Sequence, residues 1–390
     1  MEPKPNKIRL RPENQRVFAV SFLREFGMRI LVFSWKDITH PWAGGSEVNI
    51  HEQAKRWAAA GHEVTMFSPS YPGAKKSEFV DGVKIVRAGG RFSVYAMAPL
   101  YYIFKLRRSC DVIVDIENGI PFFTPLFSTK PKVTIMHHVH KTVFAKQLPF
   151  PLSKIGEFLE SMIPLVYRNV PFITGSENSK SEMVDILHMK KHSIRIIYNG
   201  LNHDKYRVAA KKAKNPVIVY FGRLMRYKNL DTLMRIFTEV IKQLPEAELW
   251  IAGTGETEAE LRELAKKLNI ENKVRFFGRV SDEDSAKILK SAWVFATCSK
   301  LEGWGITVLE GAACGTPAVA YNVSGLKESV QDNQTGLLAE DDADFADKLR
   351  ILLRDKKLRE KLSKQAIAYA KKFTWDNAAE QSLRLLLNEK

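Results

Sequence analysis

Short apolar runs alternate with helical patterns from Met28 onward, and this alternation predicts a parallel sheet covered by helices on both faces. Residues 47–60 and 179–187 carry apolar positions at helical spacing. Because parallel strands need crossover connections, the first half is expected to form a doubly wound α/β domain. Its strand-like runs are MRILVFS (28–34), HEVTMFS (62–68), VKIVRA (83–88), DVIVDI (111–116), VTIM (133–136) and FITGS (172–176).

The same pattern restarts after a polar stretch between Asp204 and Asn215, which predicts a second domain of the same kind. We therefore expect two Rossmann-like domains, at 28–205 and 206–372. The tail from Asp342 predicts three helices, the last of them in a C-terminal segment at 373–390. The strand-like runs of the second domain are VIVYFG (217–222), AELWIAG (247–253), VRFFG (274–278), WVFAT (293–297) and PAVAY (317–321).

The net charge of +16 is concentrated in the first half of the chain. Residues 1–205 contain 29 Lys and Arg against 18 Asp and Glu, whereas the remainder contains 31 against 26. Such asymmetry indicates an anionic partner for the first half, either membrane phosphate and a lipid-phosphate acceptor or nucleic acid. Solubility alone would also explain it.

Three cysteines, Cys110, Cys298 and Cys314, are too few and too scattered for a disulfide framework or structural zinc, and they suit a reducing cytosol. No apolar run reaches the roughly 18 residues of a transmembrane helix. Residues 1–27 are basic, contain VFAVSFL and lack a signal-peptide cleavage pattern. They are expected to be a basic N-terminal extension, either upstream of the true start or a disordered tail.

Two stretches of the first half could meet a membrane. Residues 91–108 mix aromatic and basic side chains, and they predict either an amphipathic helix on a bilayer or a buried crossover helix, kinked by Pro99. The apolar LPFPL (148–152) could be an acceptor-binding or membrane loop.

The segment EGWGITVLE, from Glu302 to Glu310, carries the most specific chemistry. It predicts a glycine-punctuated loop that enters a short apolar helix, with Glu310 buried about two turns inside. Backbone N–H groups at Gly303, Trp304 and Gly305 would suit an anion at the helix start. An anion seat with two carboxylates beside it fits a ligand that bears both phosphate and sugar hydroxyls, which is a nucleotide sugar.

This segment resembles the Glu-(seven residues)-Glu signature of family 4 glycosyltransferases, which are retaining enzymes of the GT-B fold. GGSE (44–47), HHVH (137–140), NGLNHDKY (199–206) and FGRLMRYKN (221–229) are similar to further family motifs in the same order, although Asn202 stands where Asp is usual. The resemblance implies two Rossmann-like doubly wound domains that face each other across a cleft. It also implies a C-terminal helix that packs back on the N-terminal domain.

Arg223 and Lys228 follow a strand that ends at Gly222, at the sheet edge where ligands bind in doubly wound folds. Both charges could stabilise a pyrophosphate leaving group without a metal. The resemblance assigns Glu310 to the ribose hydroxyls. It places Glu302 near the donor sugar, as a binding residue rather than a nucleophile.

His137 matches the family histidine, and His138 takes the position of the usual Asp. The expected catalytic residues are His137, Arg223, Lys228 and Glu302, and the expected acceptor-binding residues are Glu47 and His138. The expected donor-binding residues are Gly44, Gly45, Gly222, Arg223, Lys228, Glu302, Gly303, Trp304, Gly305, Ile306 and Glu310. No metal site is expected, since Asp-x-Asp at 282–284 and 342–344 falls at predicted helix starts, where Asp caps N–H groups.

The glycine pair Gly44-Gly45 lets backbone approach a ligand, but no G-x-G-x-x-G is present, which argues against an NAD enzyme. The sequence predicts a cytoplasmic retaining hexosyltransferase, without cofactor, that uses a nucleotide-sugar donor. The predicted acceptor is a glycan or lipid-linked glycan in polysaccharide or glycoconjugate biosynthesis, met by a peripheral enzyme on an anionic membrane surface. The alternatives are a nucleotide-sugar 2-epimerase of the same fold, which would need additional acid/base carboxylates, and a basic nucleic-acid-binding protein. No nucleic acid is expected, since that function leaves Glu302, Glu310 and Arg223 without purpose.

Overall fold

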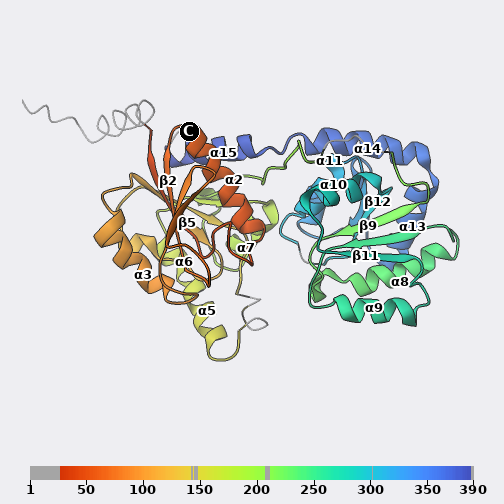
Figure 1. The fold of residues 1–390 in the computed structure, drawn as a ribbon, viewed down its shortest axis with the longest axis horizontal. Helices are drawn as coiled ribbons and strands as arrows, with labels where there is room; N and C mark the ends of the chain where they lie inside the picture. Colours follow the sequence, from red (N-terminus) through yellow and green to blue (C-terminus); the bar gives the residue numbers. More distant parts are fainter. Residues whose placement is uncertain (1–26, 142–143, 145–147, 207–210, 301, 388–390) are drawn as a thin grey trace, which may run out of the picture. The chain divides into compact units, whose positions relative to one another are not determined.

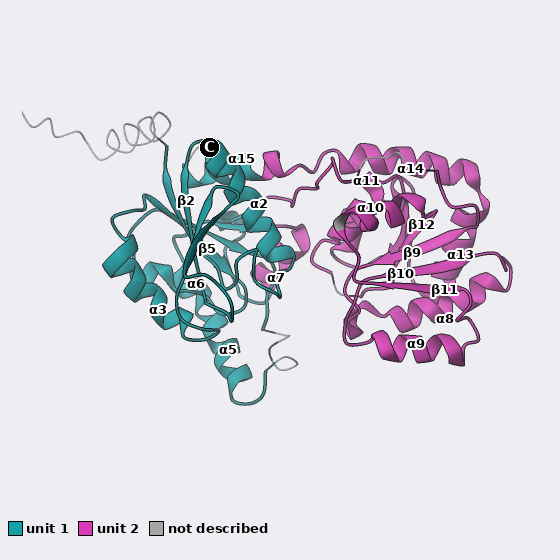
Figure 2. Cartoon of the chain, viewed as in Figure 1, with its two compact units in different colours: residues 1–173, 186–195, 379–390 teal, residues 174–185, 196–378 magenta. Residues whose placement is uncertain are grey.

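The computed structural model describes residues 27–141, 144, 148–206, 211–300 and 302–387 (Figure 1). The predicted N-terminal extension therefore lies, apart from Gly27, outside the described residues. The chain divides into two compact units (Figure 2). Unit 1 comprises Met1–Ile173, Ile186–Arg195 and Ala379–Lys390, and unit 2 comprises Thr174–Asp185 and Ile196–Ala378.

The sheet of unit 1 has eight strands in the order β3-β4-β2-β1-β5-β6-β7-β8. All six residues of β5 and the last four residues of β6 are buried, as expected for central strands covered on both faces. The strands are β1 (Arg29–Phe33), β2 (Glu63–Ser68), β3 (Ser77–Val80), β4 (Val83–Arg87), β5 (Val112–Glu117), β6 (Lys132–Met136), β7 (Phe172–Thr174) and β8 (Ile194–Ile196). The helices are α2 (Gly45–Ala59), α3 (Val94–Tyr101), the π-helix η1 (Tyr102–Leu106), η2 (Thr124–Leu126), α5 (Leu152–Ser161), α6 (Ile163–Val166), α7 (Glu177–Asp185, in unit 2) and η3 (Lys191–Ser193).

An antiparallel hairpin, β3–β4, forms one edge of this sheet, and neither β3 nor β8, the two edge strands, was predicted. The two strands are joined by Asp81 and Gly82, which have φ angles of 49° and 81°. Two consecutive positive φ angles are the signature of a type I′ turn, and Asp-Gly is among the pairs that favour it. The run VKIVRA predicts β4, whereas no apolar run marks β3.

The segment predicted at 91–108 forms α3 and η1, with Pro99 inside α3. Its inward face buries Val94, Ala98, Tyr102 and Leu106 in an apolar core with Phe33 of β1. Its outward face leaves Leu100, Ile103 and Phe104 exposed. The segment therefore buries one face, as predicted for a crossover helix, and its contact with a bilayer stays a prediction.

The sheet of unit 2 is parallel throughout, in the order β11-β10-β9-β12-β13-β14. This is the 3-2-1-4-5-6 order of the Rossmann fold. The strands are β9 (Val217–Phe221), β10 (Glu248–Ala252), β11 (Val274–Gly278), β12 (Val294–Thr297), β13 (Ala318–Tyr321) and β14 (Gly336–Ala339), the last of which was not predicted. The helices are η4 (Arg226–Lys228), α8 (Leu230–Ile241), α9 (Glu258–Lys267), α10 (Asp282–Ser291), α11 (Ile306–Ala313), α12 (Leu326–Ser329), α13 (Asp342–Arg354), α14 (Lys356–Ala370) and α15 (Trp375–Leu386, which continues into unit 1).

Alternate residues of β9 face two different cores, as the period of a strand requires. Ile218 and Tyr220 pack in the core that α8 and α13 cover, and Val217 and Val219 pack in the core that α10 and α11 cover. The prediction of two Rossmann-like α/β domains is confirmed.

The borders of the compact units differ from the predicted domain limits at 205 and 373. Residues 196–205 group with unit 2, where Leu201 forms an isolated β-bridge with Thr374 and the His203 Nε2 lies 2.9 Å from the Phe373 carbonyl. From Ala379 the last helix groups with unit 1, and the Trp57 Nε1–H donates to the Ala379 carbonyl at 3.0 Å.

The three cysteines are buried and form no disulfide. Within the described part of the chain, no helix combines the length and apolarity needed to cross a membrane.

Candidate functional site

The site in unit 2 lies where the strand order reverses, between β9 and β12. Ligands of doubly wound folds bind at the carboxyl ends of the strands at such a point. Arg223 and Lys228 follow β9, and Glu302 follows β12. The Lys228 ammonium forms an ion pair with Glu302 Oε1, and the two side chains are 14% and 17% exposed. The fold thus brings together two predicted site residues that are far apart in sequence, and it leaves both within reach of a ligand.

Two glycines of the loop after β10 allow it to touch the backbone of the loop after β9. Gly253 has a φ angle of 141°, and a Cβ atom there would lie 1.9 Å from the Gly222 carbonyl oxygen. A Cβ at Gly255 would lie 2.1 Å from the Leu224 carbonyl oxygen. Only glycine fits such approaches. These two positions were not predicted, although the letters GTG at the end of a strand-like run were the available signal.

Arg223 is exposed beside the ion pair, and its Nη2 donates to the Tyr227 hydroxyl at 3.3 Å. This partner is neutral, which leaves the guanidinium charge available to an anion. The Tyr220 hydroxyl donates to the Arg223 carbonyl at 2.9 Å. Burial, and then the charge of Glu302, raise the pKa of Tyr220. Arg223 and Glu302 therefore lie around the same buried phenol.

Helix α11 begins at Ile306, after the N-cap Gly305 with a φ angle of 74°. Glu310 is therefore just over one turn inside the helix, and the prediction of two turns was wrong. The carboxylate is also half-buried rather than buried. Its Oε1 accepts a hydrogen bond from the Tyr206 hydroxyl at 2.8 Å.

The loop from Glu302 to Gly305 divides between ligand-accessible and structural roles. Gly303 is exposed, whereas the Trp304 side chain is buried and stacks on Tyr198 with ring centroids 5.4 Å apart. Trp304 can therefore offer a ligand its backbone but not its ring. Ile306 is half-buried against the α11 core.

The corresponding switch point in unit 1 lies between β1 and β5. Gly44 caps α2, and its N–H donates to Glu47 Oε2 at 2.7 Å. The Glu47 carboxylate also meets the Lys36 ammonium at 3.4 Å and the Asn118 amide at 3.3 Å. Glu47 is only 2% exposed, so the chain itself satisfies this carboxylate. Its role in acceptor binding stays a prediction.

Gly44 and Gly45 are exposed, and a Cβ on Gly45 would meet nothing within 4 Å. The fold therefore does not require glycine at position 45, and the absent side chain leaves the start of α2 open.

The predicted histidines follow β6. Burial, and then the neighbouring His140, lower the pKa of His137 to about 4, so this imidazole is neutral at neutral pH. His138 is exposed, and its ring lies 4.0 Å from that of His140. The backbone N–H of His140 donates to Glu160 Oε1 at 2.6 Å. The structure thus gives unit 1 one neutral, half-buried histidine and one exposed histidine.

Buried carboxylates of unit 1 were missed by the sequence analysis. Asp115 and Glu117 of β5 and Glu160 of α5 are at most 1% exposed. Asp115 accepts hydrogen bonds from the Thr124 and Tyr167 hydroxyls, at 2.7 and 2.6 Å. Burial raises the pKa of both Asp115 and Glu117. The signal was present as two acids inside the apolar run VIVDIE.

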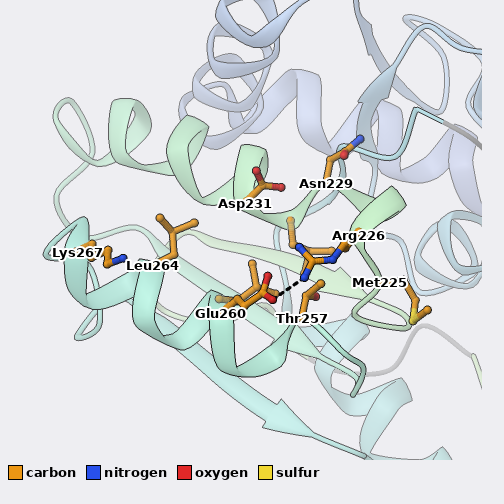
Figure 3. A pocket seen from close by; sticks show the side chains of 10 residues that line it. Met225, Arg226, Asn229, Asp231, Thr257, Glu260, Leu264 and Lys267 are labelled. Carbon is orange, nitrogen blue, oxygen red and sulfur yellow. Dashed lines mark hydrogen bonds and ion pairs between the residues drawn. The ribbon is translucent and has the colours of Figure 1, made fainter.

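A cavity of about 410 Å³ opens between α8 and α9 in unit 2 (Figure 3). The Arg226–Glu260 ion pair, at 2.7 Å, lies in its wall. Its lining includes none of the predicted site residues.

Among the described residues, no group of three or more His, Cys, Asp or Glu is placed to hold a metal. At both Asp-x-Asp stretches the cap is the preceding residue: Ser281 accepts from the Asp284 N–H, and Asp341 from the Asp344 N–H.

Comparison with known proteins covers most of the chain. Residues 203–369 match the family Glycosyl transferases group 1, and residues 43–205 match Glycosyltransferase Family 4. A D-inositol 3-phosphate glycosyltransferase of Nocardioides sp. is 33% identical over 87% of this chain and 84% of its own length. Some alignments are partial: with the protein of that name from Corynebacterium jeikeium, 53% of this chain matches 55% of the relative.

Solved structures share the fold at lower identity. Sucrose-phosphate synthase from Thermosynechococcus elongatus superimposes with a TM-score of 0.76 at 22% identity, over 91% of this chain and 97% of that chain. Anabaena HepE in complex with UDP-glucose gives a TM-score of 0.70 at 16% identity, over 92% and 99%.

Proposed function

Because this chain belongs to the group 1, family 4 glycosyltransferases, we propose that it is a retaining hexosyltransferase that uses a nucleotide-sugar donor. The observation that carries the proposal is the switch point of unit 2. There, Lys228 and Glu302 form an accessible ion pair, Arg223 stands beside them, and Glu310 projects from the following helix. Two cations and two reachable carboxylates suit a ligand that combines a diphosphate with sugar hydroxyls.

The donor diphosphate would bind at Arg223 and Lys228. Lys228 is paired with Glu302. A diphosphate would share the Lys228 ammonium and leave Glu302 with free acceptor oxygens for hydroxyls of the sugar. Glu310 would accept from the ribose, in place of or beside the Tyr206 hydroxyl. The HepE structure with UDP-glucose supports this class of donor, because that protein shares the fold.

The transfer breaks the bond between the anomeric carbon and the diphosphate oxygen, and the acceptor oxygen forms a bond to the same face of that carbon. The proton of the acceptor hydroxyl leaves with the diphosphate, so the atoms balance without a protein nucleophile. Negative charge on the leaving diphosphate increases in the transition state, and there the two fixed cations stabilise it most. The proposal therefore needs no metal.

His137 would serve as a neutral hydrogen-bonding group toward the donor sugar, consistent with its lowered pKa. We assign the acceptor to unit 1, with Glu47 and His138 as the predicted contacts. Of these, His138 is the exposed residue, and Glu47 would act through the position of Gly44 and the start of α2.

The acceptor class that fits the charge of the chain is a glycan or a lipid-linked glycan, in polysaccharide or glycoconjugate biosynthesis. The basic excess of the first 205 residues would hold a peripheral enzyme at an anionic membrane surface, on the cytoplasmic side where nucleotide sugars are available. The 2-epimerase alternative is not favoured. That reaction needs additional acid/base carboxylates, and Asp115, Glu117 and Glu160 of unit 1 are buried.

A thermal-shift screen of UDP-, GDP- and ADP-sugars tests the proposal. A ligand at 100 times its dissociation constant stabilises the folded state by about 2.7 kcal/mol, which is a clear rise in Tm. At least one nucleotide sugar should give this shift, and Arg223→Ala should reduce it. A chain that responds to none of the nucleotide sugars would contradict the proposed donor class.

A further inference from the structure

Helix α5 of unit 1 buries a polar side and exposes an apolar side. A surface helix ordinarily buries its apolar stripe and exposes its polar one. In α5 the inward positions are Ser153, Gly156 and Glu160, and all three are buried. The outward positions are Leu152, Ile155 and Phe158, and all three are exposed.

Specific contacts hold the polar side of α5 inward. The Phe144 ring packs on Gly156, where an added Cβ would lie 3.0 Å from two ring carbons. Glu160 accepts a hydrogen bond from the His140 N–H at 2.6 Å. The helix cannot rotate its apolar side inward without breaking these contacts, so the exposure is built into the packing.

The exposed apolar side chains extend beyond the helix itself. Phe150, just before α5, is 81% exposed, and Phe158 is 62% exposed. Leu165 of α6 is also exposed. We define the α5 apolar face as Phe150, Leu152, Ile155 and Phe158. Exposed apolar side chains grouped along one helix are typical of an interaction site on a folded protein.

The charge around this face selects its partner. Residues 141–170, which include α5 and α6, contain four Lys and Arg and two Glu. Glu160 is buried, and Glu157 is paired with Lys154. Lys141 and Arg168 are exposed. The surface beside α5 and α6 is therefore apolar and basic.

A second copy of the chain would place like charges against each other across a symmetric interface, which is unfavourable. A nucleic acid would use the basic residues but leave the aliphatic face in water. An anionic bilayer satisfies both features, because apolar side chains enter the headgroup region while basic ones meet lipid phosphate.

We propose that the α5 apolar face inserts into the interface of an anionic membrane, with Lys154 and Arg168 at the level of the lipid phosphates. Both basic residues are exposed, on α5 and just after α6. The inference deepens the membrane association proposed above by naming the element that makes it. It rests on that association and not on the transfer reaction.

Sedimentation of the full chain with vesicles tests the proposal. Vesicles of phosphatidylcholine and phosphatidylglycerol in equal parts should bind the protein at low salt, and phosphatidylcholine alone should bind it more weakly. Phe150→Ser with Phe158→Ser should reduce the partition coefficient by about tenfold or more, because each inserted phenyl group contributes hydrophobic transfer energy. Phe79→Ser, at an exposed phenylalanine on β3 of the same unit, is the matched control and should bind as the unchanged protein does.

A second set of variants, with its own matched control, tests the contribution of basic residues to vesicle binding. Lys154→Glu with Arg168→Glu should weaken binding to the anionic vesicles, whereas Lys357→Glu with Lys361→Glu, exposed on α14 of unit 2, should not. Equal binding by the Phe150/Phe158 variant and the unchanged protein would overturn the proposal. Sedimentation velocity that shows a dimer for the unchanged protein and a monomer for the Phe150/Phe158 variant would also overturn the proposal. That result would assign the α5 apolar face to a second copy of the chain.

The nucleotide-sugar thermal shift is measured on the same preparations. A variant that loses vesicle binding but keeps the donor shift is folded and supports the α5 assignment. Vesicle binding that persists in a chain with no donor shift would count against the proposed transferase donor and not against the membrane face.

Discussion

The two switch points of this chain occupy the same topological position in two Rossmann-like sheets, yet their carboxylates differ in exposure to solvent. In unit 2, Glu302 pairs with Lys228 while both side chains stay partly exposed. In unit 1, Glu47 is nearly sealed by Gly44, Lys36 and Asn118. A charge that the chain itself satisfies stabilises the fold, whereas a charge that it leaves accessible can bind a ligand. Topology alone therefore locates candidate sites, and exposure decides which of them can bind.

Removal of the Lys228 ammonium should have the largest effect on function. We expect Lys228→Ala to lower kcat by about 100- to 1,000-fold, as the loss of one preorganised group for transition-state charge does. Arg223→Ala should act in the same direction, and both variants should keep nearly the parental Tm. Arg226→Ala is the matched control, since Arg226 belongs to the same short helix but pairs with Glu260. Steady-state kinetics with the donor from the thermal-shift screen provides the measurement; equal losses in Arg226→Ala would show that the effect is only local structure.

The corresponding change in unit 1 should act on stability. Glu47→Ala leaves the Gly44 N–H and the Lys36 and Asn118 side chains without their carboxylate. We expect the free energy of unfolding to fall by about 2–4 kcal/mol, measured by urea denaturation. Glu63→Ala, at an exposed position of β2, should change it by no more than about 0.5 kcal/mol. If Glu47→Ala keeps its stability but loses acceptor binding, the division between the two switch points fails.

His137 should make unit 1 sensitive to acid. Its pKa is lowered to about 4 in the folded protein, and an unfolded chain would protonate it near the ordinary value of 6.5. The unfolded state therefore binds more protons between these values, so stability is lost as the pH falls below about 6.5 and levels off near 4. At about 1.4 kcal/mol per pKa unit, the loss attributable to His137 should be about 3 kcal/mol, and His137→Asn should remove it. Unfolding free energies measured across this range should respond much less to His138→Asn, at the exposed neighbour; an unchanged acid limb in His137→Asn would refute the assignment.

Chelation should have the smallest effect. Because Arg223 and Lys228 are proposed to carry the leaving-group charge, we expect EDTA to leave the transfer rate unchanged. Loss of activity on chelation, restored by magnesium or manganese, would show that the cations of unit 2 are not sufficient.

Most strands of the two sheets could be predicted from the sequence, because a buried parallel strand has a nearly continuous apolar sequence. The runs VIVYFG and DVIVDI fell within one residue of β9 and β5. Strand β3 was missed because it is short and lies at the sheet edge, where half of its residues are exposed. The Asp81-Gly82 turn could have revealed it, since a hairpin depends on turn residues rather than on apolar periodicity.

The residue types of the candidate site could also be predicted, but their contacts could not. The Lys228–Glu302 pair joins residues 74 positions apart, and it exists because β9 and β12 are neighbours in the 3-2-1-4-5-6 order. The depth of Glu310 was wrong because the left-handed conformation of Gly305 sets where α11 begins. Trp304 was predicted among the donor contacts, yet its ring belongs to the core with Tyr198 and Phe373.

The central claim is that the accessible carboxylates of unit 2 bind a nucleotide sugar, and calorimetry on Glu310→Gln tests it most directly. The best nucleotide from the screen and its 2′-deoxy analogue are titrated into the unchanged protein and the variant, with Tyr206→Phe as the control for the existing hydrogen bond. The account predicts that Glu310→Gln weakens binding of the ribonucleotide by about 1.5–3 kcal/mol and reduces the preference over the deoxy analogue. Unchanged affinity and an unchanged preference would contradict the ribose assignment, and with it the proposed site.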